Sequence, residues 1–219
     1  MNESKTKRTY SSAARAEAAE ETRARILTRA RALFGTHGIE AVTIAEIARQ
    51  SGVSASTVYA VFKSKEGILR SLMEQALFGP STQAAQQILA NVGDPVEAIA
   101  LTARVSRSIY ESESRELGPL RNVSGYAPAL RTIEEEFEQA RYAMQEERLD
   151  RLFAAGLAKP GISLAEARRI LWMYTSRDVY RMLVVGGGWT HDRYEEWLSQ
   201  TLVEALVNAL EMGGRAQRG

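Results

Sequence analysis

Apolar residues recur every three or four positions along most of the chain, with polar residues between them. One such stripe covers residues 26–34, and another covers residues 197–210. The clearest stripe consists of Leu130, Ile133, Phe137, Ala140 and Met144. This spacing is typical of helices that bury one face, and no segment shows the period of two that marks a half-buried strand. The pattern therefore predicts an all-α fold.

Capping residues divide the first part of this pattern into short helices. Thr43 begins a T-x-x-E capping box with Glu46, which predicts a short helix through Ser51. Ser54 and Ser64 are suited to cap the next two helices, because their side chains can accept hydrogen bonds from the first free backbone amides.

Breakers and apolar runs organise the later part. The pairs Gly118-Pro119 and Ala127-Pro128 should bracket a short irregular piece, after which a long helix is expected to end at Gly156. The next helix is apolar nearly all round from Ile170 to Val185, and an amphipathic helix follows it.

Residues 44–61 should form two short helices joined by a tight turn. Gly52 can adopt the left-handed backbone that such a turn needs, and Ala48 is small where the helices cross. Ile47 and Val58 are expected to point inward and fix the angle between the helices. This is the helix-turn-helix arrangement, in which the second helix enters the major groove of DNA.

The second of these helices has few large apolar residues, which leaves most of its surface for DNA. Lys63 and Lys65 follow it and should reach phosphates, although solvated surface charges are the ordinary alternative. Tyr59 taken alone could equally be an aromatic at the edge of the core. The residues expected at bases and backbone are Ala55, Ser56, Thr57, Tyr59, Ala60 and Val61.

Composition narrows the classes of function. The 219 residues, 45% of them hydrophobic, suffice for the core of one large or two small domains. The chain has no cysteine and only two histidines, without a metal-binding spacing, so we expect no metal and no cofactor. No apolar run approaches the length of a membrane span, and no secretory signal begins the chain, which predicts a cytoplasmic protein without a membrane partner.

Charge is distributed unevenly. Residues 1–78 carry 12 Lys and Arg against 8 Asp and Glu, whereas the remainder carries 16 against 19. A basic front end suggests contact with a polyanion. We expect residues 1–14 to be a mobile basic arm, because they are polar and lack helical periodicity.

Residues 20–75 resemble the TetR family of bacterial transcriptional regulators. The similarity is carried by the pattern ILxxAxxLFxxxG-x4-T-x3-IAxxxGVSxxTVYxxFxSKE, which runs from Ile26 to Glu66. The resemblance implies phosphate contacts for Thr43, Tyr59 and Lys65 and groove contacts for Ala55, Ser56 and Thr57. Ala55 and Ala60 stand where relatives often have Gln, Arg or Lys. This favours contact with thymine methyl groups, indirect readout or help from the N-terminal arm over strong hydrogen-bonded readout.

The resemblance also implies an architecture for the rest of the chain. It predicts a helix-turn-helix domain over residues 15–65, a helical bundle for effector binding and dimerisation over residues 66–212, and a flexible tail over residues 213–219. The effector would be a small apolar or amphipathic molecule, and candidates for its pocket are Arg107, Tyr110 and Trp172. The residues expected at the homodimer interface are Trp197, Leu198, Leu202 and Leu206.

The function that these observations predict is a repressor. It would bind double-stranded DNA at an inverted-repeat operator as a homodimer, and the effector would release it. One alternative is a DNA-binding dimer without an effector. The other is a helical enzyme with an incidental helix-turn-helix, which would need a nucleophile with a base, a metal or a cofactor motif, and the sequence shows none of these.

Overall fold

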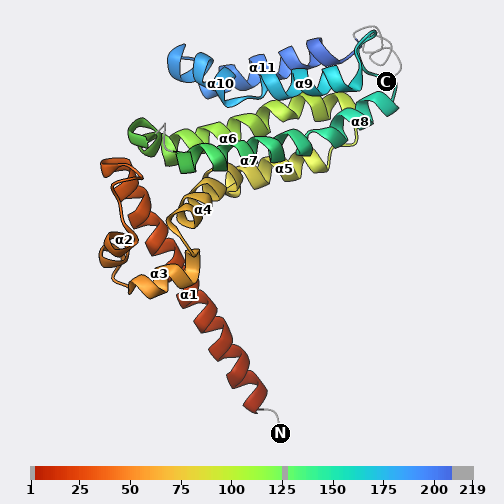
Figure 1. The fold of residues 1–219 in the computed structure, drawn as a ribbon. Helices are drawn as coiled ribbons and strands as arrows, with labels where there is room; N and C mark the ends of the chain where they lie inside the picture. The colour runs from red at the N-terminus through yellow and green to blue at the C-terminus, as the bar shows by residue number, and fades with distance from the viewer. Residues whose placement is uncertain (1–2, 125–127, 209–219) are drawn as a thin grey trace. The chain divides into compact units, whose positions relative to one another are not determined.

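Helices are the regular elements of residues 3–124 and 128–208, the part of the chain that the computed structural model describes (Figure 1). Within these ranges no β-strand forms, and a single backbone bridge joins Ala158 to Val207. The α-helices are α1 (Glu3–His37), α2 (Ile44–Ser51), α3 (Ala55–Phe62), α4 (Lys65–Phe78), α5 (Pro80–Ala90), α6 (Pro95–Ser124), α7 (Pro128–Met144), α8 (Glu146–Ala154), α9 (Leu164–Tyr174), α10 (Arg177–Tyr180) and α11 (His191–Leu206). A π-helix, Arg181–Gly186, follows α10. The predicted all-α fold is confirmed.

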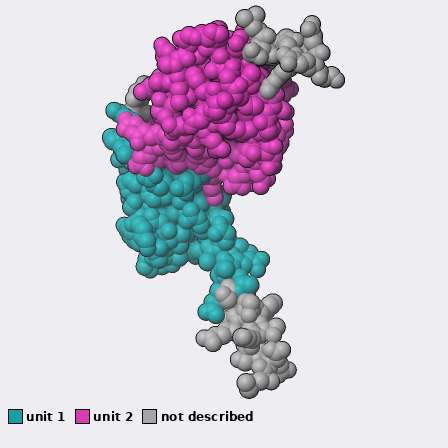
Figure 2. Space-filling model, turned by 90° about the vertical axis from the view of Figure 1, so that its right-hand side faces the viewer, with its two compact units in different colours: residues 1–74, 117–132 teal, residues 75–116, 133–219 magenta. Residues whose placement is uncertain are grey.

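The chain divides into two compact units, coloured separately in Figure 2. Unit 1 comprises residues 1–74 and 117–132, and unit 2 comprises residues 75–116 and 133–219. Helices α4, α6 and α7 each contribute residues to both units. None of the helices in the described ranges is long and apolar enough to cross a membrane.

Unit 1 is built around the predicted helix-turn-helix. Ile26 and Phe34 of α1, Ile47 of α2, and Val58 and Phe62 of α3 are buried together in its core. The apolar stripe of α1 therefore has the role that its spacing predicts, which is to cover the inner faces of two short helices.

The turn between α2 and α3 follows from one glycine and two caps. Gly52 has a φ of 66° and donates its backbone N–H to carbonyls at the end of α2. The side chains of Thr43 and Ser54 accept hydrogen bonds from the backbone amides of Glu46 and Thr57 (3.2 and 3.1 Å), so both predicted caps are confirmed. A non-glycine residue at position 52 would have to adopt a left-handed backbone that costs conformational energy.

Several boundaries differ from those expected. Residues 3–14, expected as an arm, lie in the first turns of α1, whereas residues 213–219 lie outside the described ranges. The expected break at Gly118-Pro119 is absent because α6 continues through Pro119, with Leu117 and Leu120 on either side of it fully buried. Burial of these leucines stabilises the helix and offsets the loss of the backbone hydrogen bond that proline cannot donate.

Unit 2 also breaks a helix that was expected to be continuous. α9 ends at Tyr174, Ser176 caps α10, and the backbone then widens into the π-helix. The expectation of one apolar helix from Ile170 to Val185 was therefore wrong. Thr175 explains the break, since its side chain turns back to Leu171 O (2.7 Å) and accepts hydrogen bonds from other elements.

A cluster of buried tyrosines forms the core of unit 2 between α6, α10 and α11. Tyr180 lies 5.5 Å from Tyr110 and 5.1 Å from Tyr194 between ring centroids, and all three side chains are almost completely buried. The Tyr194 hydroxyl is hydrogen-bonded to Ser106 (3.0 Å), and burial raises the pKa of Tyr194 to about 12. Buried aromatic pairs of this kind fix α6 against the C-terminal helices.

Candidate nucleic-acid interface and ligand cavity

The outer face of α3 carries small and hydroxyl-bearing side chains. Val58 and Phe62 turn inward, which leaves Ala55, Ser56 and Thr57 at the start of the helix on the outside. The hydroxyl of Ser54 lies 2.7 Å from that of Ser56 and 2.8 Å from that of Thr57. This cluster places three hydroxyl groups and a helix N-terminus on one exposed surface, as contact with DNA requires.

Tyr59 and Lys63 lie farther along the same helix. The Tyr59 side chain is 51% exposed, so packing against the core covers only part of its surface. Lys63 ends α3 with a φ of 67°, and its exposed ammonium group donates to Ala60 O (3.1 Å). Both side chains are therefore free to approach a DNA backbone, as is Thr43, whose exposed hydroxyl already caps α2.

Lys65 has a different position from the one expected. Its ammonium group donates to the backbone carbonyls of Ile39 (2.8 Å) and Val42 (3.3 Å), and that of Glu40 lies at 3.5 Å. An ammonium group has three donors, and these carbonyls occupy them. Lys65 therefore holds the loop before α2, and its expected role as a phosphate contact stays a prediction.

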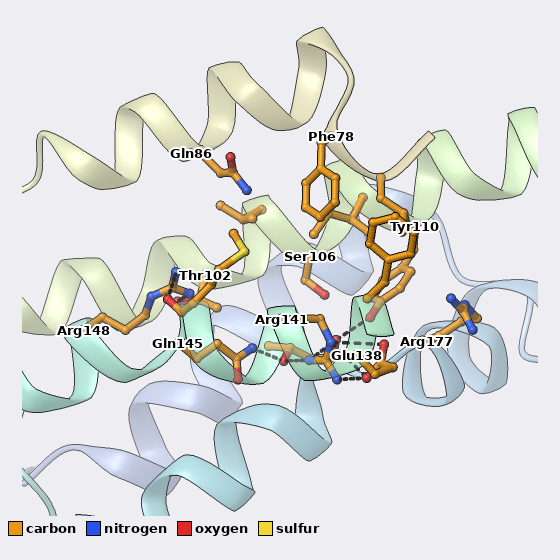
Figure 3. Close-up of a pocket in the computed structure, with 16 residues that line it drawn as sticks. Phe78, Gln86, Thr102, Ser106, Tyr110, Glu138, Arg141, Gln145, Arg148 and Arg177 are labelled. Atoms are coloured by element: carbon orange, nitrogen blue, oxygen red, sulfur yellow. Dashed lines mark hydrogen bonds and ion pairs between the residues drawn. The ribbon is translucent and has the colours of Figure 1, made fainter. Parts of the chain in front are cut away.

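A cavity of about 50 Å³ lies within unit 2, between α4, α5, α6, α7 and α8 (Figure 3). Its apolar wall includes Leu77 and Phe78 at the end of α4, Val105 and Ile109 of α6, and Phe137 of α7. The space is far below the ~300–1,000 Å³ of typical ligand pockets. A ligand of drug size must therefore push these helices apart.

One side of the cavity is a network centred on Arg141. The guanidinium group forms an ion pair with Glu138 (2.6 Å) and donates to the carbonyl of Trp172 (3.1 Å) and the hydroxyl of Thr175 (2.7 Å). Tyr110, an expected pocket residue, does line the cavity and donates its hydroxyl to Thr175 O (2.9 Å). Burial raises the pKa of Tyr110, so its hydroxyl remains a donor.

Arg148 lies at the opposite end of the cavity and has weaker partners. It donates to the Thr102 hydroxyl (3.3 Å) and to Met144 O (3.4 Å), and no ion pair joins it to a carboxylate among the described residues. Burial lowers the pKa of Arg148 to about 10, although nearby Glu147 opposes the shift. Two buried amide atoms of the lining, Gln86 Nε2 and Gln145 Oε1, have no hydrogen-bond partner within the described part of the chain.

The other two expected pocket residues lie elsewhere. Arg107 faces α11, where it pairs with Asp192 (2.6 Å) and Glu195 (2.8 Å). Burial disfavours its charge, but these partners and Glu111 outweigh that effect and raise the pKa of Arg107. Trp172 packs against Tyr142 and under the Arg141 guanidinium, so it supports the polar network from outside the cavity. Both expectations are therefore corrected.

Polar residues at helical spacing were the missed signal for this cavity. Glu138, Arg141, Gln145 and Arg148 recur every three or four positions and share the inner face of α7 and α8. The expected apolar face is correct at Leu130 and Ile133, which are buried, but Ala140 and Met144 are exposed. The inner face therefore turns polar beyond Phe137, where Arg141 pairs with Glu138 and Gln145 donates to Thr175.

The expected dimer-interface residues also need correction. Leu198, Leu202 and Leu206 have no exposed area in the single chain, because this face of α11 packs against α9. Trp197 is partly exposed and lies edge-on to Tyr174 and Trp189. The three leucines thus belong to the core of unit 2. Among the described residues, no group of acidic or histidine side chains is arranged to hold a metal ion.

Comparison with known proteins matches this geometry. The family model of the tetR family of bacterial regulatory proteins matches residues 26–72. The HTH-type transcriptional repressor ComR of Escherichia coli (strain K12) is 25% identical over 135 residues, which are 61% of this chain. The match spans 64% of ComR, just under two thirds of its length.

Solved structures share the whole fold. NalD, the secondary repressor of the MexAB-OprM multidrug efflux pump in Pseudomonas aeruginosa, superposes with a TM-score of 0.68 at 24% identity, covering 88% of this chain and 99% of that one. A SmeT–triclosan complex superposes with a TM-score of 0.64 at 20% identity, covering 86% and 93% of the two chains. Residues 26–72 therefore match the tetR family of bacterial regulatory proteins, and they contain the helix-turn-helix that α2 and α3 form.

Proposed function

We propose that the chain is a transcriptional repressor that binds an inverted-repeat operator as a homodimer and is released when a small molecule enters the cavity. The observation that carries this proposal is the position of α4. Its first residue, Lys65, holds the loop before α2, and its last residues, Leu77 and Phe78, line the cavity.

The small volume of the cavity gives a ligand the means to act. A ligand larger than about 50 Å³ displaces the walls, and Phe78 is part of them. It therefore prefers a conformation in which the end of α4 has moved, and such a preference is what shifts an equilibrium. A coupling of roughly 1–3 kcal/mol would weaken operator binding about 5- to 150-fold.

The outer surface of α3 supplies the contacts with DNA. Ala55, Ser56 and Thr57 would read base edges and thymine methyl groups, while Thr43, Tyr59 and Lys63 would contact phosphates. A homodimer would place its two recognition helices about 34–36 Å apart, one turn of DNA.

Exposed apolar side chains in unit 2 support dimerisation. Met173 of α9 is 47% exposed, and Met182 and Val185 of the π-helix are 65% and 64% exposed. Their burial against the same surface of a second copy would produce a symmetric interface. This assignment replaces the leucines of α11 as interface candidates.

Selection of duplexes from a random DNA library tests the proposal. We expect the wild-type protein to select an inverted repeat and to sediment as a dimer. The Met182→Glu variant should sediment as a monomer and lose operator binding. Thr57→Ala should alter the selected sequence more than the affinity. A folded protein that selects no specific duplex, or that binds one as a monomer, would contradict the proposal.

A second candidate, a DNA-binding dimer without an effector, is favoured by the small size of the cavity. It predicts that no compound bound by unit 2 changes operator affinity. Titration of apolar compounds, triclosan included because SmeT was solved with it, against a preformed operator complex separates the two candidates.

A further inference from the structure

One cation of the cavity, Arg148, forms no ion pair with a carboxylate in the described part of the chain. Its charged lining residues are Glu138, Arg141, Arg148 and Arg177. Arg141 is paired with Glu138, and Arg177 is paired with Glu113 (2.8 Å). Within residues 3–124 and 128–208, Arg148 has only the two long hydrogen bonds described above, to a hydroxyl and a carbonyl. The lining therefore carries a surplus positive charge at the Arg148 end.

A second unpaired donor lies at the same end. The Nε2 atom of Gln86 in α5 is buried and has no hydrogen-bond partner among the described residues. Figure 3 shows Gln86 on the same side of the cavity as Arg148, away from Tyr110 and Arg177. Both residues also line a groove of about 380 Å³ on the outside of α5, α6 and α8. A ligand entering from this groove would meet the guanidinium and the amide first.

The orientation of the Gln145 side-chain amide agrees with a surplus of donors at the Arg148 end of the cavity. Thr175 donates its hydroxyl proton to Leu171 O, so Gln145 must donate to Thr175 through Nε2 (2.8 Å). Its Oε1 is left as an acceptor, next to the Arg141 network. The donors without strong partners are thus on Gln86 and Arg148, at the groove end.

We propose that the ligand of this cavity is an amphipathic carboxylic acid, whose carboxylate binds Arg148 and Gln86 and whose apolar body lies among Leu77, Phe78, Val105 and Phe137. The inference rests on the proposed function in one respect, that this cavity is the effector site. A guanidinium binds a carboxylate through two parallel charge-assisted hydrogen bonds, which are stronger than those to neutral groups. Burial of the Arg148 side chain strengthens this attraction further, because less water competes for the charge.

Calorimetric titration of matched pairs tests the proposal. The probes are hexanoate, octanoate and decanoate, each against the primary alcohol of the same length, and 3-phenylpropanoate against 3-phenylpropan-1-ol. We expect wild-type protein to prefer the carboxylate at least tenfold in the pair that fits best. Arg148→Met should reduce that preference to less than twofold without changing the affinity for the alcohol. Gln86→Leu should lower the affinity for the carboxylate severalfold.

Two controls keep the result interpretable. Arg104→Met removes an exposed arginine of α6 and should behave as wild type. Thermal unfolding should show Arg148→Met to be at least as stable as wild type, since burial already penalises the charge. If that variant does not fold, Arg148→Gln and Gln86→Leu decide the outcome.

Three results would overturn the proposal: equal binding of carboxylate and alcohol, carboxylate binding that survives Arg148→Met, or no carboxylate bound at millimolar concentration. Operator release is measured separately by fluorescence anisotropy. Carboxylates that bind through Arg148 without releasing DNA would support the ligand class and refute the effector role. Neutral compounds that bind and release DNA would do the reverse.

Discussion

The helix-turn-helix and the ligand cavity differ in how the chain assembles them. In α2 and α3, each cap and turn lies within about a dozen residues of its partners, and each capping hydroxyl accepts from a backbone amide three positions later. The cavity instead unites residues from Leu77 to Arg177, and its central pair of hydrogen bonds joins Arg141 to carbonyls 31 and 34 positions away. Local contacts leave a signature in the sequence, whereas contacts between distant helices do not.

The same difference separates side chains that face DNA from those that hold the fold. Ser56 and Tyr59 of α3 are exposed, whereas Arg141 and Gln145 form hydrogen bonds to Glu138 and Thr175 within unit 2. Substitutions should therefore affect DNA binding in the first region and stability in the second. Four predictions test this comparison, from the largest expected effect to the smallest.

Leu202→Glu should give the largest effect. It places a carboxylate where the side chain has no exposed area, so we expect the free energy of unfolding to fall by roughly 4 kcal/mol or more. Thermal unfolding followed by circular dichroism measures this. Gln200→Glu, on the exposed side of the same helix, should change stability by less than about 0.5 kcal/mol. A Leu202→Glu variant that is stable but monomeric would return this residue to the dimer interface.

The burial of Leu202 and its neighbours also illustrates what hydrophobic periodicity can and cannot predict. The stripe of α11 predicted correctly that Leu198, Leu202 and Leu206 are buried, but it could not show whether α9 or a second subunit covers them. A helix needs an apolar partner, and the spacing is the same for either. The break at Thr175 was invisible for a related reason, since it depends on Arg141 and Gln145 from another helix.

The DNA-binding region was predicted more completely, with one instructive exception. The caps and the turn at Gly52 followed from residue types at fixed spacing, and the exposure of Tyr59 agrees with what the resemblance to the TetR family implied. Lys65 did not, because its acceptors are carbonyls 23 to 26 positions earlier, and every residue type supplies the same carbonyl. Backbone partners leave no trace in composition or periodicity.

Arg141→Met should have the second largest effect. It leaves Glu138 and Thr175 without their strongest donor in a half-buried site, which we expect to cost about 3 kcal/mol of unfolding free energy. Adding Glu138→Gln should recover part of this loss, because the unpaired carboxylate is then removed. Arg49→Met breaks the pair with Glu46 on the surface of α2 and should leave the unfolding midpoint almost unchanged. Similar losses at Arg141 and Arg49 would show that the two regions do not differ as described.

Lys65→Ala and Lys63→Ala should separate positioning from phosphate contact. Loss of the hydrogen bonds from Lys65 to the loop before α2 should cost about 2 kcal/mol of stability. Lys63→Ala should leave stability unchanged and lower the slope of log K against log salt by about 0.9, the value for one phosphate contact. Unfolding curves and salt titrations of operator binding measure both. A reduced salt slope for Lys65→Ala with unchanged stability would instead support the phosphate contact first expected of it.

Tyr59→Phe and Tyr110→Phe compare one hydroxyl group in each region and should give the smallest effects. The Tyr59 hydroxyl is on a half-exposed side chain, so its removal should leave stability unchanged and weaken binding to all duplexes by about 0.5–1.5 kcal/mol, roughly two- to twelvefold. The Tyr110 hydroxyl donates to Thr175 O in the buried core, so its removal should lower stability by about 1 kcal/mol and leave DNA affinity unchanged. Fluorescence anisotropy with specific and random duplexes, together with thermal unfolding, distinguishes these outcomes. If Tyr59→Phe weakened only the specific duplex, Tyr59 would read bases rather than phosphates, and the division of α3 into reading and anchoring residues would have to be redrawn.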